Sequence, residues 1–357
     1  MENVGRIDSA RYRVAWVDVA KGFCIVMVVM MHSTLGVEAA MGETGWMGTL
    51  VEYARPFRMP DFFLIAGLFL PARIAAPLRL YVDRKILHFV YFYVLWLTIQ
   101  FAFKAPAFAA DFGWAGTLGL YLHSFVEPFG TLWFIYHLAI FFAVTRLVHN
   151  RVPFWLVWLV AAALEIAPIH TGSMLIDEFA SRFVYFYTGF ILAGAILRFA
   201  ERVDRHMALG LVYLALWGVL NGFLVFSGIA DWPFVSLALG LAGAIAVCIA
   251  AVLATKTLAM RPLTYLGQNS IVVYLAFFLP MVVSREVILR SGLVSDVSLI
   301  ALLVTAAGVI GPIILYELTR RTGWCTFLFV RPSWARIDQP WQKGAARGQK
   351  AAIAPAE

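Results

Sequence analysis

The stretch of sequence that decides the fold is WVDVAKGFCIVMVVMMHS, residues 16–33. Apart from Asp18, Lys21 and the closing His32-Ser33 pair, it is apolar throughout, and the run continues to about residue 36. A helix that spans a bilayer needs about 20 mostly apolar residues. We therefore predict a first transmembrane helix over residues 16–36.

Further apolar stretches of similar length follow along the chain, which predicts an all-α, polytopic bundle of about ten transmembrane helices. The second stretch is short and carries Arg58 and Asp61 near its start. The apolar segment 114–126 fits a re-entrant or interfacial piece better than a span. The ten candidate spans are roughly 16–36, 57–71, 86–104, 131–148, 153–169, 179–197, 207–228, 232–254, 263–284 and 297–318.

The composition agrees with a membrane domain. Hydrophobic residues make up 62% of the 357 residues and charged residues only 14%, whereas a soluble domain carries about 25% charge. So few charges cannot cover a water-exposed surface of this size, so lipid is expected to cover part of it. The three cysteines do not suggest a disulfide framework or a zinc site.

The net charge of +7 is distributed unevenly between the two sides of the predicted bundle. With ten spans both termini share a side, and most Lys and Arg residues lie in the loops and tail on that side. The positive-inside rule then predicts a plasma (inner) membrane protein with both termini in the cytoplasm. This topology explains the positive net charge, so the charge does not indicate nucleic-acid binding. The opposite side holds Arg55, Arg58, Lys104, Arg182, Arg285 and Arg290.

Three regions follow from this topology. Residues 1–15 form a cytoplasmic N-terminal segment, residues 16–320 the transmembrane domain, and residues 321–357 a basic, mobile cytoplasmic tail. No internal repeat is evident, which weakens the assignment to a secondary transporter, since many transporter folds contain repeated halves.

Lys21 and His32 are the strongest candidates for chemistry, because ionisable residues inside spans are costly and are functional candidates by default. Eleven residues at about 100° each leave a net turn of about 20°, so both side chains share one helix face, separated along the axis by roughly 16 Å. Asp18 precedes Lys21 by three residues and is placed to pair with it. The plainer alternative is that Lys21 snorkels to one surface while His32 sits at the other interface.

Several motifs together resemble the acyltransferase type 3 family of membrane proteins, in the branch that includes fucose 4-O-acetylases. The first helix opens with Asp18-x-x-Lys21-Gly22 and places His32 eleven residues after the lysine. The others are FRMPDFFLIAG (57–67), the basic pair Arg84-Lys85, LWFIY (132–136), and LGQNS (266–270) with Tyr274-Leu275. The resemblance extends from about residue 12 to about residue 320.

The resemblance implies an O-acyltransferase that moves an acyl group, by default acetyl, from cytoplasmic acyl-CoA to a hydroxyl of an extracytoplasmic glycan or lipid-linked sugar. It implies that His32 is the catalytic base or a transient acyl carrier and that Lys21 is its basic partner. Arg84 and Lys85 are implied to meet the anionic CoA. His88, one turn after Arg84, is a further candidate for CoA binding by its spacing. No metal is implied.

The chain also departs from the family pattern at four points. Ala66 stands where the family usually has serine, Lys21 where arginine is more frequent, and Phe277-Phe278 where many members have a second histidine. Leu87 occupies the second basic position of the family's R-x-x-R, so that motif is only partly met.

Further polar residues are candidates for acceptor binding, each with a structural alternative. Arg58 and Asp61 line an acceptor site or form a structural ion pair. Trp133 and Tyr136 are either substrate contacts or packing groups. Arg182, among Tyr185 and Tyr187, recognises a sugar or is an interfacial charge, and Asp18 is a candidate through its pairing with Lys21.

Motifs of several other enzyme classes are absent from the sequence. There is no G-x-S-x-G, H-E-x-x-H, P-loop, D-D-x-x-D or metal-ligand cluster, which argues against serine hydrolases, zinc proteases, ATPases and metal-dependent prenyl transfer. Two rivals remain: a small-solute transporter or flippase, and a membrane assembly subunit.

Overall fold

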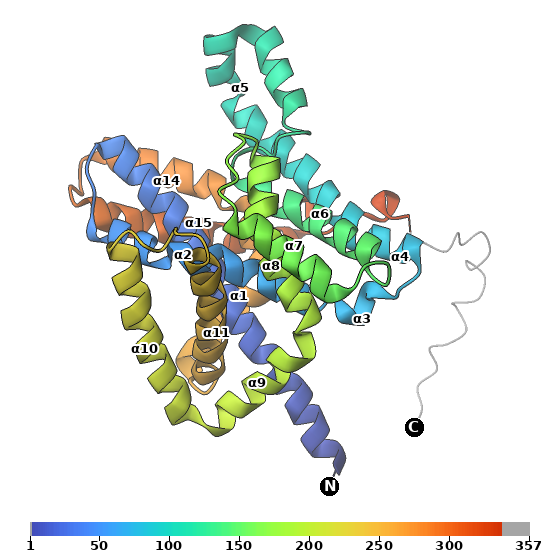
Figure 1. Ribbon diagram of the computed structural model, residues 1–357. Helices are drawn as coiled ribbons and strands as arrows, with labels where there is room; N and C mark the ends of the chain where they lie inside the picture. The colour runs from blue at the N-terminus through green and yellow to red at the C-terminus, as the bar shows by residue number, and fades with distance from the viewer. Residues whose placement is uncertain (1, 338–357) are drawn as a thin grey trace, which may run out of the picture.

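A computed structural model describes residues 2–337, with side chains described from Ala15 onward. This part of the chain is helical and contains no strand (Figure 1). The prediction of an all-α polytopic protein is confirmed.

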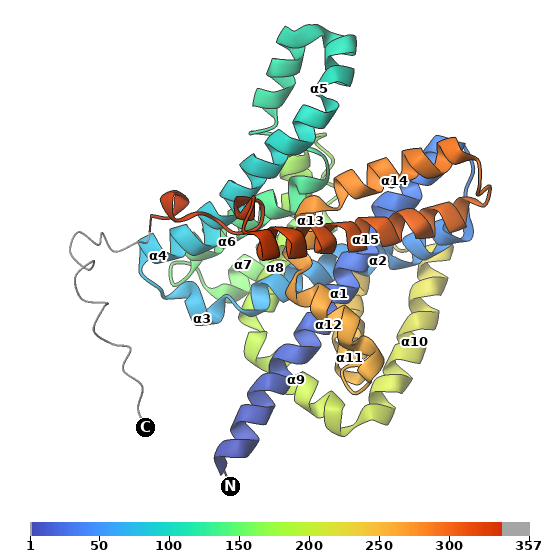
Figure 2. The same ribbon diagram turned by 180° about the vertical axis from the view of Figure 1, so that it is seen from behind.

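The central helix of the bundle is α1, Glu2–Met41. It packs against α2 (Trp46–Leu68), α11 (Val235–Ala254), α12 (Arg261–Gln268) and α15 (Val297–Thr322). Figures 1 and 2 show α1 running through the middle of the molecule, with α15 crossing it at the back. The helix that carries Lys21 and His32 is therefore surrounded by protein over much of its length.

The number of spans differs from the ten predicted. Within residues 2–337, six helices are long and apolar enough to cross a membrane, and up to eight if each of two bent pairs counts as one span. The two other candidates fall short for different reasons. Helix α2 carries Glu52, Arg55, Arg58 and Asp61, and α7 (Phe154–Ile166) is apolar but only 13 residues long.

Both bent pairs have a short break inside an apolar stretch. Helices α8 (Met174–Ile191) and α9 (Ala193–Arg205) meet at 74°, and α13 (Ser270–Ala276) and α14 (Phe278–Ser291) meet at 55°. Broken helices inside a bundle are tolerated where neighbouring protein satisfies the freed backbone groups. The second break places Phe277 at the corner between α13 and α14, beside α1.

Helix α5 (His88–His123) ends in a projecting hairpin. Gly113 has φ 68° and ψ 168°, a conformation that favours glycine, and the chain turns back there. Figure 1 shows this hairpin standing out from the bundle. The segment 114–126 is thus the returning arm of a hairpin, consistent with the prediction that it is not a span of its own.

Shorter elements complete the described chain. A π-helical turn, Asp83–Leu87, joins α4 to α5. The other helices are α3 (Pro71–Ile74), α4 (Leu78–Val82), α6 (Trp133–Val148) and α10 (Met207–Phe226), with short 3-10 turns at Gly130–Leu132, Leu258–Met260, Thr326–Leu328 and Ser333–Ala335.

Candidate acyl-transfer site

Two glycines bring α12 very close to the Lys21 turn of α1. A Cβ added at Gly267 would lie 1.6 Å from the carbonyl oxygen of Asp18, and one added at Gly22 would lie 2.1 Å from the carbonyl oxygen of Leu263. Only glycine lets two backbones approach this closely, as small residues do at membrane helix crossings. The crossing fixes α1 at the turn that carries Asp18 and Lys21.

Lys21 and His32 share one face of α1, and the end of this face that carries Lys21 is partly buried and charged. Lys21 Nζ lies 3.9 Å from Asp18 Oδ1 and 5.4 Å from the centre of the Phe69 ring. The predicted Asp18–Lys21 pair is therefore present. The lysine side chain keeps 32% of its surface exposed, and Lys21 contributes to the wall of a cavity.

A cavity of about 180 Å³ lies next to Lys21. Its walls are mostly apolar, with Ser270 and the Tyr274 side chain among them, and Ala66 contributes to the wall. Alanine in place of the serine usual in the family therefore leaves a small apolar side chain at the cavity. The other lining residues are Phe62, Ile65, Phe89, Phe134, Ile135, Leu138 and Ile271.

Aromatic rings connect this cavity with His32. The His32 and Phe277 ring centres are 5.5 Å apart and tilted by 34°, and Phe277 in turn lies 6.4 Å from Tyr274, which lines the cavity. Phenylalanine, at a position where many family members have a second histidine, thus supports the imidazole by ring contact. The ring nitrogens of His32 have no hydrogen-bond partner among the described residues.

Arg58 brings positive charge to the His32 end of this face of α1. Arg58 lies within electrostatic range of His32, and Arg182 within range of Arg58. The Arg58 guanidinium donates to the Val51 carbonyl at 3.2 Å, while its Nε is buried without a partner. Arg182 is paired with Glu178 at 3.0 Å. Two of the predicted acceptor residues, Arg58 and Arg182, are therefore brought together near the predicted base.

Asp61 does not pair with Arg58, although the two residues are three apart on α2. Its carboxylate is buried, and neither oxygen has a hydrogen-bond partner among the described residues. It lies instead within electrostatic range of Cys24 on α1 and Cys248 on α11. The predicted Arg58–Asp61 pair is therefore absent, and Asp61 lies buried inside the bundle near α1 and α11.

Trp133 and Tyr136 pack away from the Lys21 cavity. The Tyr136 hydroxyl donates to the backbone carbonyls of Phe125 and Val126 at 3.1 and 3.2 Å. The Trp133 ring lies 6.0 Å from the Phe63 ring. Neither side chain lines the cavity beside Lys21, so their role in acceptor binding stays a prediction.

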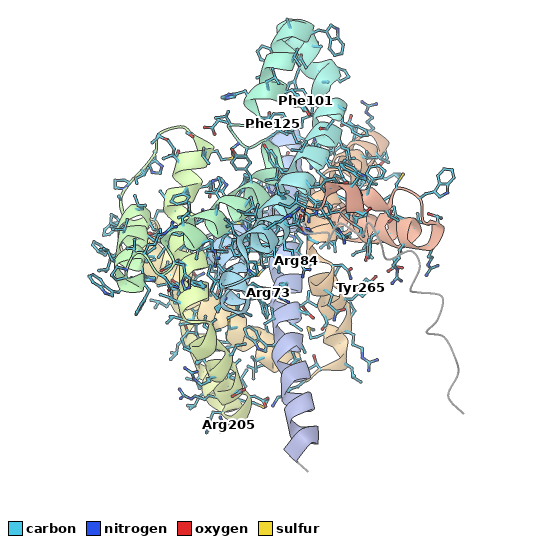
Figure 3. The ribbon with its side chains drawn as sticks, turned by 90° about the vertical axis from the view of Figure 1, so that its right-hand side faces the viewer. Arg73, Arg84, Phe101, Phe125, Arg205 and Tyr265 are labelled. Carbon is cyan, nitrogen blue, oxygen red and sulfur yellow. The ribbon has the colours of Figure 1, made fainter. Side chains whose placement is uncertain are left out.

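The π-helical turn Asp83–Leu87 presents the predicted CoA-binding residues. Single π-turns inside α-helices are frequent at functional sites. Lys85 Nζ lies 4.8 Å from the centre of the Phe142 ring and is within electrostatic range of both Lys21 and Arg73. His88 follows on the first turn of α5, within range of Lys85. Figure 3 shows Arg73 and Arg84 well away from Phe101 and Phe125 at the hairpin end of α5.

A segment near the end of the described chain holds the π-helical turn in place. The buried Arg331 side chain donates to the Asp83 carbonyl oxygen at 2.8 Å and to Asp83 Oδ2 at 2.5 Å, and the Ile337 amide donates to Asp83 Oδ1 at 2.8 Å. Tyr91 and Trp96 of α5 donate to carbonyls of the same segment at 3.0 Å each. We call residues 326–337 the strap. It lies within the region predicted as a mobile tail, whose residues from 338 onward are outside the described part.

The helices around this charged, partly buried face define a polytopic membrane protein with an internal polar site. The acyltransferase domain family matches the chain from residue 14 to residue 317. The chain therefore belongs to the acyltransferase type 3 family, and the resemblance in its motifs is confirmed.

One relative shows a more limited likeness. The inner membrane protein YcfT of Escherichia coli (strain K12) is 27% identical over 157 residues. The aligned part covers 37% of this chain and 43% of that protein. No solved structure matches the chain.

Reasoning from sequence missed Arg73 and the strap. Arg73 lies on α3 and joins Lys85 and Lys21 in one group of cations, but in sequence it looks like any other cytoplasmic loop charge. Arg331 lies 248 residues from Asp83, so no local pattern connects them. The Arg84-Lys85 pair itself is visible in the sequence, but no residue pattern there predicts the π-helical turn that carries it.

Proposed function

We propose that this protein is a membrane O-acyltransferase that moves an acyl group, by default acetyl, from cytoplasmic acyl-CoA to a hydroxyl of an extracytoplasmic glycan or lipid-linked sugar. The observation that carries the proposal is one continuous helix, α1, with Lys21 next to a cationic group and a cavity, and His32 next to a second cationic group. A donor from one side and an acceptor from the other can then meet along one face.

The donor would approach from the side of the π-helical turn. Arg84, Lys85 and His88 would hold the CoA phosphates, since cations next to one another bind phosphate oxygens through charge-assisted hydrogen bonds. The narrow cavity beside Lys21 suits the flexible, uncharged arm that carries the thioester. Lys21, held by Asp18, would orient the donor at the entrance to that cavity.

The transfer needs one base and a stabilised oxyanion. The His32 imidazole would take the proton of the acceptor hydroxyl as its oxygen attacks the thioester carbonyl. Arg58 would stabilise the negative charge that develops on the carbonyl oxygen. When the carbon–sulfur bond breaks, the imidazolium would return the proton to the departing sulfur, giving free CoA thiol and the acyl ester.

The proposed acceptor side is the end of the face around His32, where Arg58 and Arg182 would bind sugar hydroxyls. Four further residues are proposed as substrate contacts on the basis of the sequence alone: Asp18, Asp61, Trp133 and Tyr136. We place the protein in the inner membrane, in line with the description of its relative YcfT as an inner membrane protein, with both termini in the cytoplasm.

Binding of acyl-CoA by the purified protein distinguishes this function from a transporter or flippase, which has no use for the donor. We expect the wild-type protein in detergent to bind acetyl-CoA, measured by isothermal titration calorimetry. Replacing Arg84 and Lys85 together with glutamine should weaken binding roughly 10- to 100-fold, because charge-assisted hydrogen bonds to phosphate are lost. The loss of affinity should be larger at low salt than at high salt, because high salt already screens the contact between these cations and the phosphates in the wild type.

The matched control for this double variant is Arg198→Gln with Arg202→Gln. These two exposed cations lie on α9, so the net charge changes equally. The control should bind acetyl-CoA like the wild type. A wild-type protein that binds no acyl-CoA would refute the proposed function, and equal affinity in both double variants would refute the role of Arg84 and Lys85.

The proposed topology has its own test. A reporter enzyme active only outside the cytoplasm should be silent when fused after Glu357. The same reporter inserted at Gly113, at the tip of the α5 hairpin with no atom within 4 Å of an added Cβ, should be active. The opposite pattern would invert the orientation and remove the reason to place CoA at the π-helical turn.

A further inference from the structure

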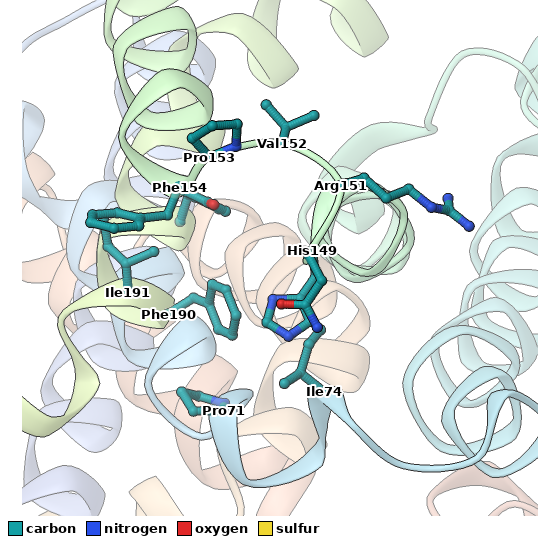
Figure 4. Close-up of a pocket in the computed structure, with 11 residues that line it drawn as sticks. Pro71, Ile74, His149, Arg151, Val152, Pro153, Phe154, Phe190 and Ile191 are labelled. Carbon is teal, nitrogen blue, oxygen red and sulfur yellow. The ribbon is translucent and has the colours of Figure 1, made fainter.

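A larger cavity, of about 680 Å³, lies outside the site described above. Its walls come from α3, the connection between α6 and α7, and the end of α8 (Figure 4). Under the proposed topology all three segments are on the cytoplasmic side. Its lining includes Pro71, Ile74, His149, Arg151, Tyr187 and Phe190.

The cavity has the character of a site for a flat aromatic ligand. Its walls are mainly apolar, with few polar groups, as in most small-molecule sites. The His149 and Phe190 ring centres are 5.7 Å apart at 78°, so one ring presents its edge to the face of the other. Figure 4 shows the His149 ring between Phe190 and Ile74. Aromatic and imidazole rings stack favourably on nucleobases of any sequence.

Tyr187 adds an independent observation. This side chain is only 2% exposed and lines the cavity. Its hydroxyl makes no hydrogen bond within the part of the chain whose side chains are described, residues 15–337. A tyrosine hydroxyl at a cavity wall that has no protein partner is free to donate a hydrogen bond to a polar atom of a ligand in that cavity.

The cavity connects to the site through a series of cations. Arg73 lies on α3 between Pro71 and Ile74, two residues of the cavity wall. Lys85 is within electrostatic range of both Arg73 and Lys21. The order from the cavity to the catalytic face is therefore an aromatic-lined pocket, then positive charge, then the narrow cavity beside Lys21.

This order matches the chemistry of an acyl-CoA, which consists of an adenosine end, a phosphate-rich middle and a thin arm ending in the thioester. We propose that the cavity at His149 and Tyr187 binds the adenosine end of the donor, with the base stacked on His149. The inference rests on the proposed function and adds a specificity site to it. The thioester end alone, without its nucleotide, would then be a poor donor.

Two other occupants fit the cavity less well. The glycan acceptor belongs on the opposite side under the proposed topology. A small inorganic anion would need converging cations, but the Arg151 guanidinium donates to the Leu147 carbonyl at 3.0 Å and, in Figure 4, extends away from the His149 and Phe190 rings.

The test compares two donors, acetyl-CoA and S-acetylpantetheine, which share the thioester arm but differ in the nucleotide. Full-length His149→Ala should raise the Kd for acetyl-CoA roughly 5- to 100-fold, because one stacking contact is lost. Its Kd for S-acetylpantetheine should be unchanged. Tyr187→Phe should raise only the acetyl-CoA Kd, by roughly 2- to 10-fold, since it removes one hydrogen bond and keeps the ring.

The control is His206→Ala, an exposed histidine between α9 and α10, which should leave both affinities unchanged. Adenosine 3′,5′-bisphosphate should compete with acetyl-CoA in the wild type and compete weakly in His149→Ala. Unchanged affinities in both cavity variants, or equal losses for the two donors, would overturn the inference while the proposed function stands. If the wild-type protein bound no acetyl-CoA, both the inference about this cavity and the proposed function would be refuted.

Discussion

Replacing His32 with alanine is expected to remove most acyl transfer while leaving the protein in the membrane. A general base contributes about 10²- to 10⁴-fold to a rate, and His32 is an imidazole within electrostatic range of Arg58. His32 is only partly buried and makes a ring contact with Phe277 rather than a hydrogen bond. Its loss should therefore cost little stability. The measurement is mass spectrometry of acyl groups on cell-surface glycans from a strain that lacks the gene and carries each variant.

The comparison variants separate catalysis from structure. His206→Ala should restore full acylation at equal abundance. Lys21→Arg should retain more activity than Lys21→Ala, because the positive charge beside Asp18 is kept even though the geometry of the group changes. Full acylation with His32→Ala would refute the proposed base and favour the transporter alternative.

The second large effect is expected at Gly267, where alanine should prevent stable folding of the membrane domain. The added Cβ would lie 1.6 Å from the Asp18 carbonyl oxygen and 2.5 Å from its carbon. Both are backbone atoms of α1 and cannot rotate aside, so the two helices must separate. Overpacking of this kind costs typically 1–3 kcal/mol, and more where a backbone must move. Size-exclusion yield and thermal unfolding of the detergent-purified protein measure the loss.

Gly119→Ala is the matched control, since nothing lies within 4 Å of a Cβ at Gly119 on α5. It should be as abundant and as stable as the wild type. Normal yield and melting temperature for Gly267→Ala would contradict the close crossing of α1 and α12. Because the crossing positions Asp18 and Lys21, surviving Gly267→Ala protein should also transfer acyl groups poorly.

The spans could be predicted from sequence because a membrane helix is defined by local composition. Each of the ten candidate stretches is helical, but length and charge decide which of them qualifies as a span. α7 is short, and α2 carries four charged residues. The 74° break after Ile191 and the 55° break at Phe277 were not visible in sequence, since the residues there remain apolar and the bends depend on neighbouring helices.

The candidate site was predictable where it depends on one helix. Lys21, His32 and Asp18 share α1, and their spacing fixes their relation. Arg58 and Asp61 also share a helix, yet the predicted pair is absent. Pro56 and Pro60 lie in that stretch of α2, and Asp61 turns toward α1 and α11. The grouping of Arg73 with Lys85 depends on how separate helices pack, which no spacing rule gives.

The strap has a consequence for how the protein is made. Asp83 is synthesised early, but its buried partner Arg331 leaves the ribosome only after α15, the last helix of the bundle. An unfinished chain therefore inserts with the π-helical turn unsecured and an acidic side chain lacking its counter-ion. A chain truncated before residue 326 would carry every apolar helix of residues 2–337 and still lack the clamp on Asp83. The surface that carries Arg84 and Lys85 is therefore completed only after α15 has been synthesised.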